Sequence, residues 1–206
     1  MDLSKKNHYY SAVRHDVISI IPDRPFKKIL EIGGGESNTL LELVKKYNAQ
    51  GWAVDLIHLN KKKFKSIQGS IEDKKIINKL PNNHFDLITA CDVLEHLQDT
   101  NHFFDVTHQK LSKNGLLVLS VPNIRQIRTL YHLFVKGSFP REEVGLFDKT
   151  HLRWFCKKDV VKIARHHGFE ILDYKSVGKC VPKLLDQTLF AEFLALQNIF
   201  VLSKKK

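Results

Sequence analysis

The stretch KKILEIGGGESNTLLELV, residues 27–44, decides the fold of this chain of 206 residues. An apolar run at 28–32 predicts a buried strand, and three glycines at 33–35 follow it directly. The apolar residues of 37–47 recur at the spacing of an α-helix. Glycines between a strand and a helix let the backbone turn sharply and approach a ligand closely. The stretch therefore predicts the first strand–turn–helix unit of an α/β fold.

The rest of the chain repeats this alternation. Strands interleaved with helices are typical of a doubly wound, Rossmann-like sheet with helices on both faces. We expect seven strands, mostly parallel, with the last one antiparallel. The further strands are predicted at 52–56, 65–68, 86–90, 116–121, 169–174 and 197–202, and the further helices at 8–21, 100–111 and 157–167.

The composition is that of a globular domain. Hydrophobic residues make up 43% and charged residues 27%, which excludes a disordered or fibrous chain. Three cysteines with no CxxC pair cannot form a complete disulfide framework, so we expect a cytoplasmic protein. No segment resembles a signal peptide or a membrane span. We expect a single domain over 1–206, with an N-terminal helical lid at 1–24 and a substrate-side insertion at 124–156.

The net charge of +11 comes from 33 basic and 22 acidic residues. Such a charge can indicate a polyanionic partner, either a nucleic acid or an anionic membrane surface. However, 26 of the basic residues are lysines spread along the chain, whereas arginine is preferred for bidentate phosphate recognition. We therefore favour a solvated lysine-rich surface over a nucleic-acid partner. The densest internal basic run, at 61–65, is the feature that supports the alternative of a nucleic-acid partner.

An acidic residue follows the glycine turn at an informative spacing. Asp55 lies at the end of the second predicted strand, 20 residues after Gly35. A carboxylate at this place can accept hydrogen bonds from both hydroxyls of a ribose. The helix N-terminus after the turn favours an anionic group. Together these features predict a site for a nucleoside cofactor.

The identity of that cofactor depends on Asn38 and Glu31. Asn38 stands where the dinucleotide fingerprint requires its third glycine, so that pattern fails. Glu31 lies within the first strand, where a carboxylate needs a partner. NAD carries no ammonium to pair with it, whereas S-adenosylmethionine carries an ammonium and a sulfonium. We expect S-adenosylmethionine; the alternative is a Glu31 paired only with protein donors.

Motifs along nearly the whole chain resemble those of class I S-adenosylmethionine-dependent methyltransferases. The resemblance is greatest to bacterial enzymes that act on small metabolites, including quinone-biosynthesis and polysaccharide-associated enzymes. Ser37 replaces the third glycine of the family's usual GxGxG at a tolerant position. The motifs are ILEIGGGES at 29–37, VD at 54–55, FDLITACDVLEHL at 85–97, LSKNGLLVLSVPN at 111–123 and THLRWF at 150–155.

The resemblance also implies a set of cofactor-binding residues. Glu31 and the three glycines would hold the methionine end of the cofactor, and Arg14 would close over its carboxylate. Asp55 would hold the ribose, with Leu56 against the adenine. The full set is Arg14, Glu31, Gly33, Gly34, Gly35, Asp55, Leu56, Ser70, Ile71 and Cys91.

Candidate catalytic groups lie in the loops that follow the strands, because ligands bind at the carboxyl ends of open α/β sheets. His96 is our first candidate for a general base and His151 the second, since imidazole titrates near neutrality. The alternative for each is a structural role in its loop. Asn123 and Arg153 are candidate substrate contacts.

A metal site is a less favoured reading of the same loop. Some quinone-type relatives use acidic and histidine residues there for a divalent metal. Asp92, Glu95 and His96 could do so, but their close spacing does not direct all three inward. We therefore expect no metal.

The sequence thus predicts an S-adenosylmethionine-dependent methyltransferase that acts on a small-molecule acceptor, with oxygen as the favoured atom of attack. The alternatives are an RNA methyltransferase of the same fold, a non-catalytic S-adenosylmethionine-binding protein and a nucleotide-dependent oxidoreductase. The presence of Gly33, Gly35 and Asp55 argues against loss of the cofactor site. The sequence does not indicate an oligomeric state.

Overall fold

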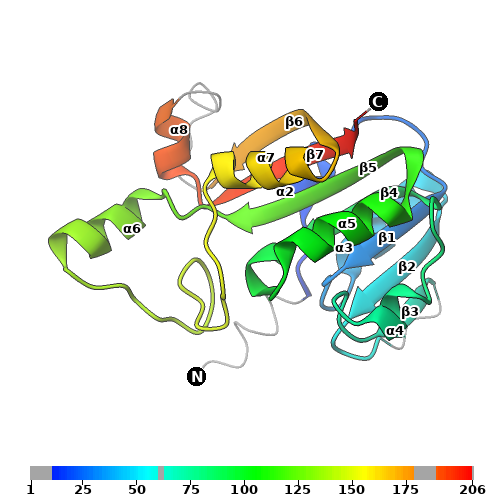
Figure 1. Ribbon diagram of the computed structural model, residues 1–206, viewed down its shortest axis with the longest axis horizontal. Coiled ribbons are helices and arrows are strands. Elements are labelled where there is room, and N and C mark those ends of the chain that lie inside the picture. Colours follow the sequence, from blue (N-terminus) through cyan, green and yellow to red (C-terminus); the bar gives the residue numbers. More distant parts are fainter. Residues whose placement is uncertain (1–10, 60–62, 179–188, 206) are drawn as a thin grey trace.

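The protein is built on one seven-stranded sheet with the strand order β3-β2-β1-β4-β5-β7-β6 (Figure 1). The computed structural model describes residues 11–59, 63–178 and 189–205. Strand β7 pairs antiparallel with both of its neighbours, and the remaining pairs are parallel. The predicted doubly wound sheet is confirmed. Its strands are β1 (Lys28–Ile32), β2 (Gln50–Asp55), β3 (Lys65–Gln68), β4 (Phe85–Cys91), β5 (Leu111–Pro122), β6 (Phe169–Val177) and β7 (Gln197–Lys204).

Three long helices agree with the sequence prediction to within one residue at each end: α3 (Asn38–Tyr47), α5 (Thr100–Lys110) and α7 (Lys157–His166). Several short helical turns were not predicted, because they are too short to show a periodic pattern. They are α4 (Lys74–Ile77), the 3₁₀ turn η1 (Leu94–His96), α6 (Ile127–Leu130), the π-helical turn η2 (Tyr131–Val135) and α8 (Leu189–Leu194).

Two apolar layers cover the sheet, one on each face. Successive strand residues point to opposite faces, so Ile29 packs in one layer and Leu30 in the other. Leu43 of α3 joins the layer of Ile29, whereas Phe104 of α5 and Val160 of α7 join the layer of Leu30. Burial of both faces explains why the central strands read as continuous apolar runs.

The helix predicted at 8–21 is wrong in its extent. Residues 8–10 lie outside the described residues, and within 11–21 the one full helical turn is α2 (His15–Ile18). Arg14 precedes α2 with a ψ of 71°, which is not helical. Its amide N–H donates to Thr39 Oγ1 at 3.0 Å, and its side chain binds other elements. These tertiary contacts override the local helical pattern.

The segment 124–156 projects beyond the carboxyl end of β5 (Figure 1). It carries α6 and η2 and returns to the body at Phe155, which forms a parallel bridge with Asn123. Among the residues that the structure describes, no helix has the length and apolarity needed to cross a membrane.

Phe104→Ala should destabilise the protein strongly. The Phe104 side chain is fully buried, with its ring 5.6 Å from that of Phe103 and 5.9 Å from that of Phe169. Loss of such a ring leaves a cavity, and we expect a fall of about 3–5 kcal/mol in the free energy of unfolding, measured with urea. Leu172→Ala on β6, at a side chain 54% exposed, is the control and should change stability by less than about 0.5 kcal/mol. Similar losses in both variants would contradict this packing.

Candidate active site

The predicted cofactor-binding residues gather at one edge of the sheet. Strands β1, β2 and β4 are parallel, with Ile32 of β1 in register with Val54 and Ala90. Their carboxyl ends therefore meet, and the glycine turn, Asp55 and Cys91 follow or end these three strands. This is the edge at which open α/β sheets bind ligands.

The glycine turn has no room for side chains. Gly33 has a φ of +68°, and a Cβ added there would lie 2.4 Å from Val93 Cγ2. A Cβ on Gly34 would lie 2.1 Å from Oε2 of Glu31. The buried Glu31 side chain thus lies directly against the turn. This arrangement suits an anionic anchor for the cationic end of the expected cofactor.

Asp55 is tied to the same turn. Its Oδ2 accepts a hydrogen bond from the Gly35 N–H at 2.8 Å, and its Oδ1 accepts one from the Ile57 N–H at 3.0 Å. The next residue, Leu56, is exposed at 71%. The carboxylate and the glycine turn therefore form one unit, with an exposed apolar side chain beside it.

The other predicted adenine contacts differ in their surroundings. Ser70 Oγ accepts a hydrogen bond from the Glu72 N–H at 3.1 Å, which leaves the hydroxyl free to donate. Ile71 is buried in the core layer that contains Ile76. The burial of Ile71 favours a role in supporting the loop over one in touching a ligand.

Arg14 is held by carboxylates of the chain itself. Its Nη1 lies 2.8 Å from Asp92 Oδ2, and its Nε and Nη2 bind both oxygens of Asp16 at 3.0 and 2.9 Å. Gln197, the first residue of β7, donates to Asp92 Oδ1 at 2.9 Å and accepts from Arg14. Burial alone would lower the pKa of Arg14, but the charges of Asp92 and Asp16 outweigh it and raise that pKa. The guanidinium therefore stays charged and joins the N-terminal segment to the ends of β4 and β7.

Sequence reasoning missed Asp92 and Gln197 as members of this network. Asp92 has a φ of +55°, a conformation that Asp adopts more readily than most residues. Gln197 reaches this edge only because β7 runs antiparallel to β5, so that its first residue lies beside Pro122. Cys91, the neighbour of Asp92, has a thiol whose pKa burial raises to about 12, so it is protonated at neutral pH.

Glu95, His96 and His151 form a second cluster beside the edge. Glu95 is 1% exposed, and neither carboxylate oxygen makes a hydrogen bond within the described chain. His151 Nε2 lies 3.9 Å from Glu95 Oε1. The rings of His96 and His151 meet edge to face, with centroids 4.8 Å apart. The structure thus brings together the two histidines that the sequence singled out.

Backbone carbonyls set the tautomer of both histidines. Nδ1 of His96 lies 3.2 Å from the Thr150 carbonyl, and Nδ1 of His151 lies 3.2 Å from the Leu146 carbonyl. A carbonyl can only accept a hydrogen bond, so each Nδ1 carries the proton and each neutral ring keeps its lone pair on Nε2. The His96 side chain is exposed, whereas that of His151 is buried. Only His96 can meet a ligand without displacement of its neighbours.

Burial shapes the charges of this cluster. It raises the pKa of Glu95 well above its ordinary value, with the charge of Asp92 acting in the same direction. Burial also lowers the pKa of His151, and the neighbouring His96 acts in the same direction. Glu95 and His151 therefore both favour their neutral forms.

The cluster also has the composition of a metal site. One possible ligand atom from each of Glu95, His96 and His151 lies within 4.8 Å of the others. This set differs from the three residues that we considered from the sequence, because Asp92 pairs with Arg14 instead. The prediction that no metal binds stays a prediction.

The two predicted substrate contacts both bind the backbone. Arg153 donates from Nη1 to the Leu97 carbonyl at 2.6 Å and from Nη2 to the Gln98 carbonyl at 2.5 Å. Asn123 is 1% exposed, and its amide donates to the carbonyls of Glu192 and Ala195 in and after α8. These bonds fasten the loops around the edge, a positioning role that the sequence pattern did not indicate.

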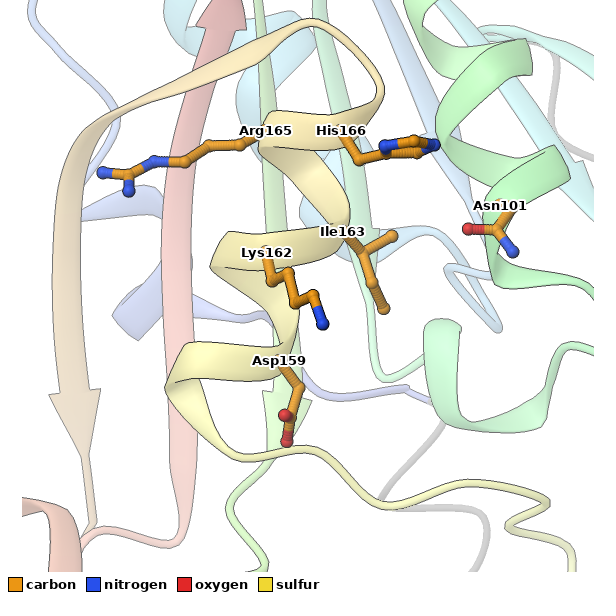
Figure 2. Close-up of a pocket in the computed structure, with 6 residues that line it drawn as sticks. All are labelled: Asn101, Asp159, Lys162, Ile163, Arg165 and His166. Atoms are coloured by element: carbon orange, nitrogen blue, oxygen red, sulfur yellow. The ribbon is translucent and has the colours of Figure 1, made fainter.

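A hollow of about 630 Å³ lies elsewhere, between α5 and α7 (Figure 2). Figure 2 shows Ile163 of α7 directed toward Asn101 of α5, with Lys162 and Asp159 below it. Its lining comes from helices on one face of the sheet, and none of the predicted site residues contributes to it. The hollow is therefore separate from the candidate active site.

Comparisons with known proteins place this geometry in a family. Residues 6–174 match the family described as a methyltransferase domain. No curated protein sequence matches the chain significantly. A solved S-adenosylmethionine-dependent methyltransferase from Archaeoglobus fulgidus superimposes with a TM-score of 0.68 at 16% identity, covering 100% of both chains.

Two further solved structures share the fold. An S-adenosylmethionine-dependent methyltransferase from Clostridium acetobutylicum has a TM-score of 0.65 at 17% identity over 99% of each chain. A Haloferax volcanii methyltransferase, solved in complex with the Trm112 methyltransferase activator, has a TM-score of 0.67 at 12% identity. That match covers 98% of this chain and 91% of the other. At these identities the likeness is one of fold.

Glu95→Gln should change the pH dependence of stability. Because the pKa of Glu95 is raised on folding, the folded protein keeps this proton at pH values where the unfolded chain has released it. The free energy of unfolding should therefore fall as pH rises from about 4.5 toward neutrality, and the fall should be smaller in the variant by about 1 kcal/mol or more.

The comparison should be made by urea unfolding at a series of pH values. His151, with its lowered pKa, acts in the opposite direction in both proteins, so the difference between parent and variant is the quantity of interest. Glu42→Gln, at an exposed position on α3, is the control. Parallel pH curves for the parent and Glu95→Gln would refute the burial argument.

Proposed function

The chain belongs to the class I S-adenosylmethionine-dependent methyltransferases, and from that premise we propose that it methylates an oxygen of a small-molecule acceptor. We propose a small-molecule acceptor because the sequence motifs resemble those of quinone-biosynthesis and polysaccharide-associated enzymes. The proposal also treats 1–206 as one domain, with 1–24 as a lid and 124–156 as a substrate-side insertion. The observation that carries the choice of oxygen is the exposed His96, whose Nδ1 lies 3.2 Å from both the Thr150 carbonyl and Thr150 Oγ1. Because the Thr150 hydroxyl donates to Asp148, both groups accept, and we assign the proton to Nδ1 and the lone pair to Nε2.

The residues at the carboxyl edge fit the cofactor. When bound, S-adenosylmethionine supplies a methyl group on a sulfonium, which is already a good leaving group. Glu31 offers a buried carboxylate beneath the glycine turn, where a cation would be stabilised. Asp55 accepts two backbone hydrogen bonds and keeps lone pairs for ribose hydroxyls. Leu56, exposed beside Asp55, offers an apolar surface to a base.

His96 is the proposed proton acceptor. A hydroxyl is a weak nucleophile until its proton is removed, and a positioned base contributes about 10²–10⁴-fold. The Thr150 carbonyl holds Nδ1–H, so Nε2 is the atom that accepts the proton. His151 and Glu95 lie behind His96 and are buried, so we assign them positioning roles.

The loops that carry this cluster are fastened to one another. The N–H groups of Leu152 and Arg153 both donate to the Glu95 carbonyl. The Arg153 guanidinium donates to the carbonyls of Leu97 and Gln98 in the same loop. Arg14 likewise joins the N-terminal segment to Asp92. Because positioning supplies a large part of the rate of a displacement reaction, these bonds support catalysis without touching the acceptor.

The RNA alternative gains no support from the structure. The basic run at 61–65 lies partly outside the described residues, since 60–62 are not described. We therefore keep a small molecule as the proposed acceptor.

Asp55→Ala should weaken the binding of S-adenosylmethionine at least tenfold. Hydrogen bonds to a charged acceptor contribute about 1.5–3 kcal/mol each, and the substitution removes two of them. Calorimetric titration measures the effect, with Asp23→Ala at an exposed site as the control. Because Asp55 also holds the glycine turn, Asp55→Asn should be measured as well and should bind with intermediate affinity. Unchanged affinity in folded Asp55→Ala would refute the assignment.

His96→Ala should lower turnover by about 10²-fold or more while leaving cofactor affinity nearly unchanged. The assay follows labelled methyl transfer from S-adenosylmethionine into fractionated cell extract.

Two further variants separate catalysis from structure. His151→Ala should cost stability but less turnover than His96→Ala, because its side chain is buried behind His96. His166→Ala, on an exposed position of α7, should change neither. Full turnover in both His96→Ala and His151→Ala would mean that positioning alone supports the reaction.

A further inference from the structure

Residues 124–141, here called the arm, expose an unusual amount of apolar surface. The arm comprises α6, η2 and the residues that follow, and it projects from the body beyond the carboxyl end of β5 (Figure 1). Phe134 is 82% exposed and Val135 is 69% exposed. Large apolar side chains on the arm that are at least 41% exposed also include Ile127, Tyr131, Leu133 and Phe139.

The polarity of the arm is inverted relative to an ordinary surface helix. Such a helix turns its apolar side chains toward the core and its polar ones toward water. Here Thr129 is buried, and the His132 ring packs on the buried Phe147 ring with centroids 5.7 Å apart. Meanwhile Phe134 and Val135 face outward. The arm is therefore held to the body through Thr129, His132 and the Phe139 ring, which lies 5.2 Å from that of Phe147 and 5.1 Å from that of Trp154. Phe134 and Val135 remain exposed to a partner.

The charge of the arm is of one sign. Its sequence, IRQIRTLYHLFVKGSFPR, contains four cationic residues and no carboxylate. Arg125 pairs with Glu192 and Arg128 with Glu142, both outside the arm. Lys136 and Arg141 make no ion pair within the described residues, and both lie close in sequence to Phe134, Val135 and Phe139. The most exposed apolar side chains are thus accompanied by available cations.

From this combination we propose that the arm docks on the surface of an anionic lipid bilayer, with Phe134 and Val135 inserted among the lipids and Lys136 and Arg141 at the headgroups. Apolar side chains that enter the acyl boundary and cations that meet anionic headgroups both contribute to interfacial binding. No spanning helix is needed for this mode.

A second copy of the chain fits the arm less well than a bilayer does. Symmetric dimers place the same surface patch on both sides of the contact. Lys136 and Arg141 of both copies would then lie in one contact, and neither arm has a carboxylate to neutralise them. An anionic bilayer neutralises them and at the same time removes the apolar side chains from water.

The arm lies next to the candidate active site, so docking of the arm would also position that site. The arm begins immediately after Asn123, at the edge of the sheet that carries the candidate active site. Docking would bring that edge close to the lipid headgroups. This inference rests on the arm alone and holds whatever acceptor the enzyme methylates.

The test is flotation of the full chain with vesicles of phosphatidylcholine alone or mixed equally with phosphatidylglycerol. The parent protein should float with the mixed vesicles at low salt, bind them less at high salt and bind phosphatidylcholine weakly. The double variant Phe134→Ser, Val135→Ser should bind the mixed vesicles about tenfold less or weaker still. Phe134 and Val135 are both exposed, so this double variant should fold like the parent, which thermal unfolding will check.

Two matched controls make the outcome specific. Leu172→Ser changes a side chain 54% exposed on β6 and should bind like the parent. Lys136→Glu with Arg141→Glu should lower binding to mixed vesicles about tenfold, whereas Lys45→Glu with Lys46→Glu, on the exposed end of α3, makes the same change in net charge and should have a much smaller effect.

Three results would overturn the proposal. The first is no flotation of the parent with mixed vesicles, and the second is equal flotation of the parent and both arm variants. The third is a dimer, detected by light scattering, that Phe134→Ser, Val135→Ser abolishes while vesicles fail to bind. That result would assign the arm to a second copy of the chain. Loss of methyl transfer with vesicle binding intact would overturn the proposed function and leave docking in place.

Discussion

The turn after β1 imposes the steric constraint on which the rest of the site depends. Gly33 and Gly34 are packed so closely against Val93 and Glu31 that neither position has space for a Cβ. The backbone of the turn therefore packs directly against the buried Glu31 side chain, and its N–H groups bind the neighbouring strand, with that of Gly33 donating to the Val54 carbonyl at 2.8 Å. One of these groups, the N–H of Gly35, binds Asp55 and joins the turn to β2. Glu31 is thereby held beside the turn, where we propose that the cationic end of the cofactor binds.

A second set of charges joins segments that are distant in the sequence. Arg14 comes from the N-terminal segment, Asp92 follows β4, and Gln197 begins β7, yet their side chains share one network. An ion pair of this kind is sensitive to the loss of either partner, because the remaining charge would be left partly buried. The network therefore makes the placement of the N-terminal segment depend on the complete sheet, including its last strand.

The histidine cluster shows how burial can divide roles between like residues. His96 and His151 have the same chemistry and similar backbone partners for Nδ1. The exposed ring is the proposed proton acceptor, whereas the buried ring lies against Glu95 and has a pKa that burial lowers. Both sit in loops that follow the sheet edge, and Arg153 fastens those loops to each other. The division follows from depth in the structure and not from residue type.

The sequence by itself determined the sheet and its first binding loop. Apolar runs and helical spacing located the seven strands and the three long helices, since burial on both faces leaves a strong local pattern. The spacing from the glycines to Asp55 also indicated that these predicted cofactor residues lie together, because parallel strands bring their carboxyl ends to one edge.

Only the tertiary structure decided what the isolated side chains do. Arg14 pairs with Asp92 and Asp16, and Asn123 and Arg153 bind loop carbonyls. Within residues 11–21, the predicted helix is reduced to α2. The inverted polarity of the arm was equally hidden, since a run such as YHLFV looks like core until its surroundings are known. The local sequence pattern indicates how apolar a segment is. The partners of its polar groups, in contrast, are residues distant in the chain that only the fold brings close.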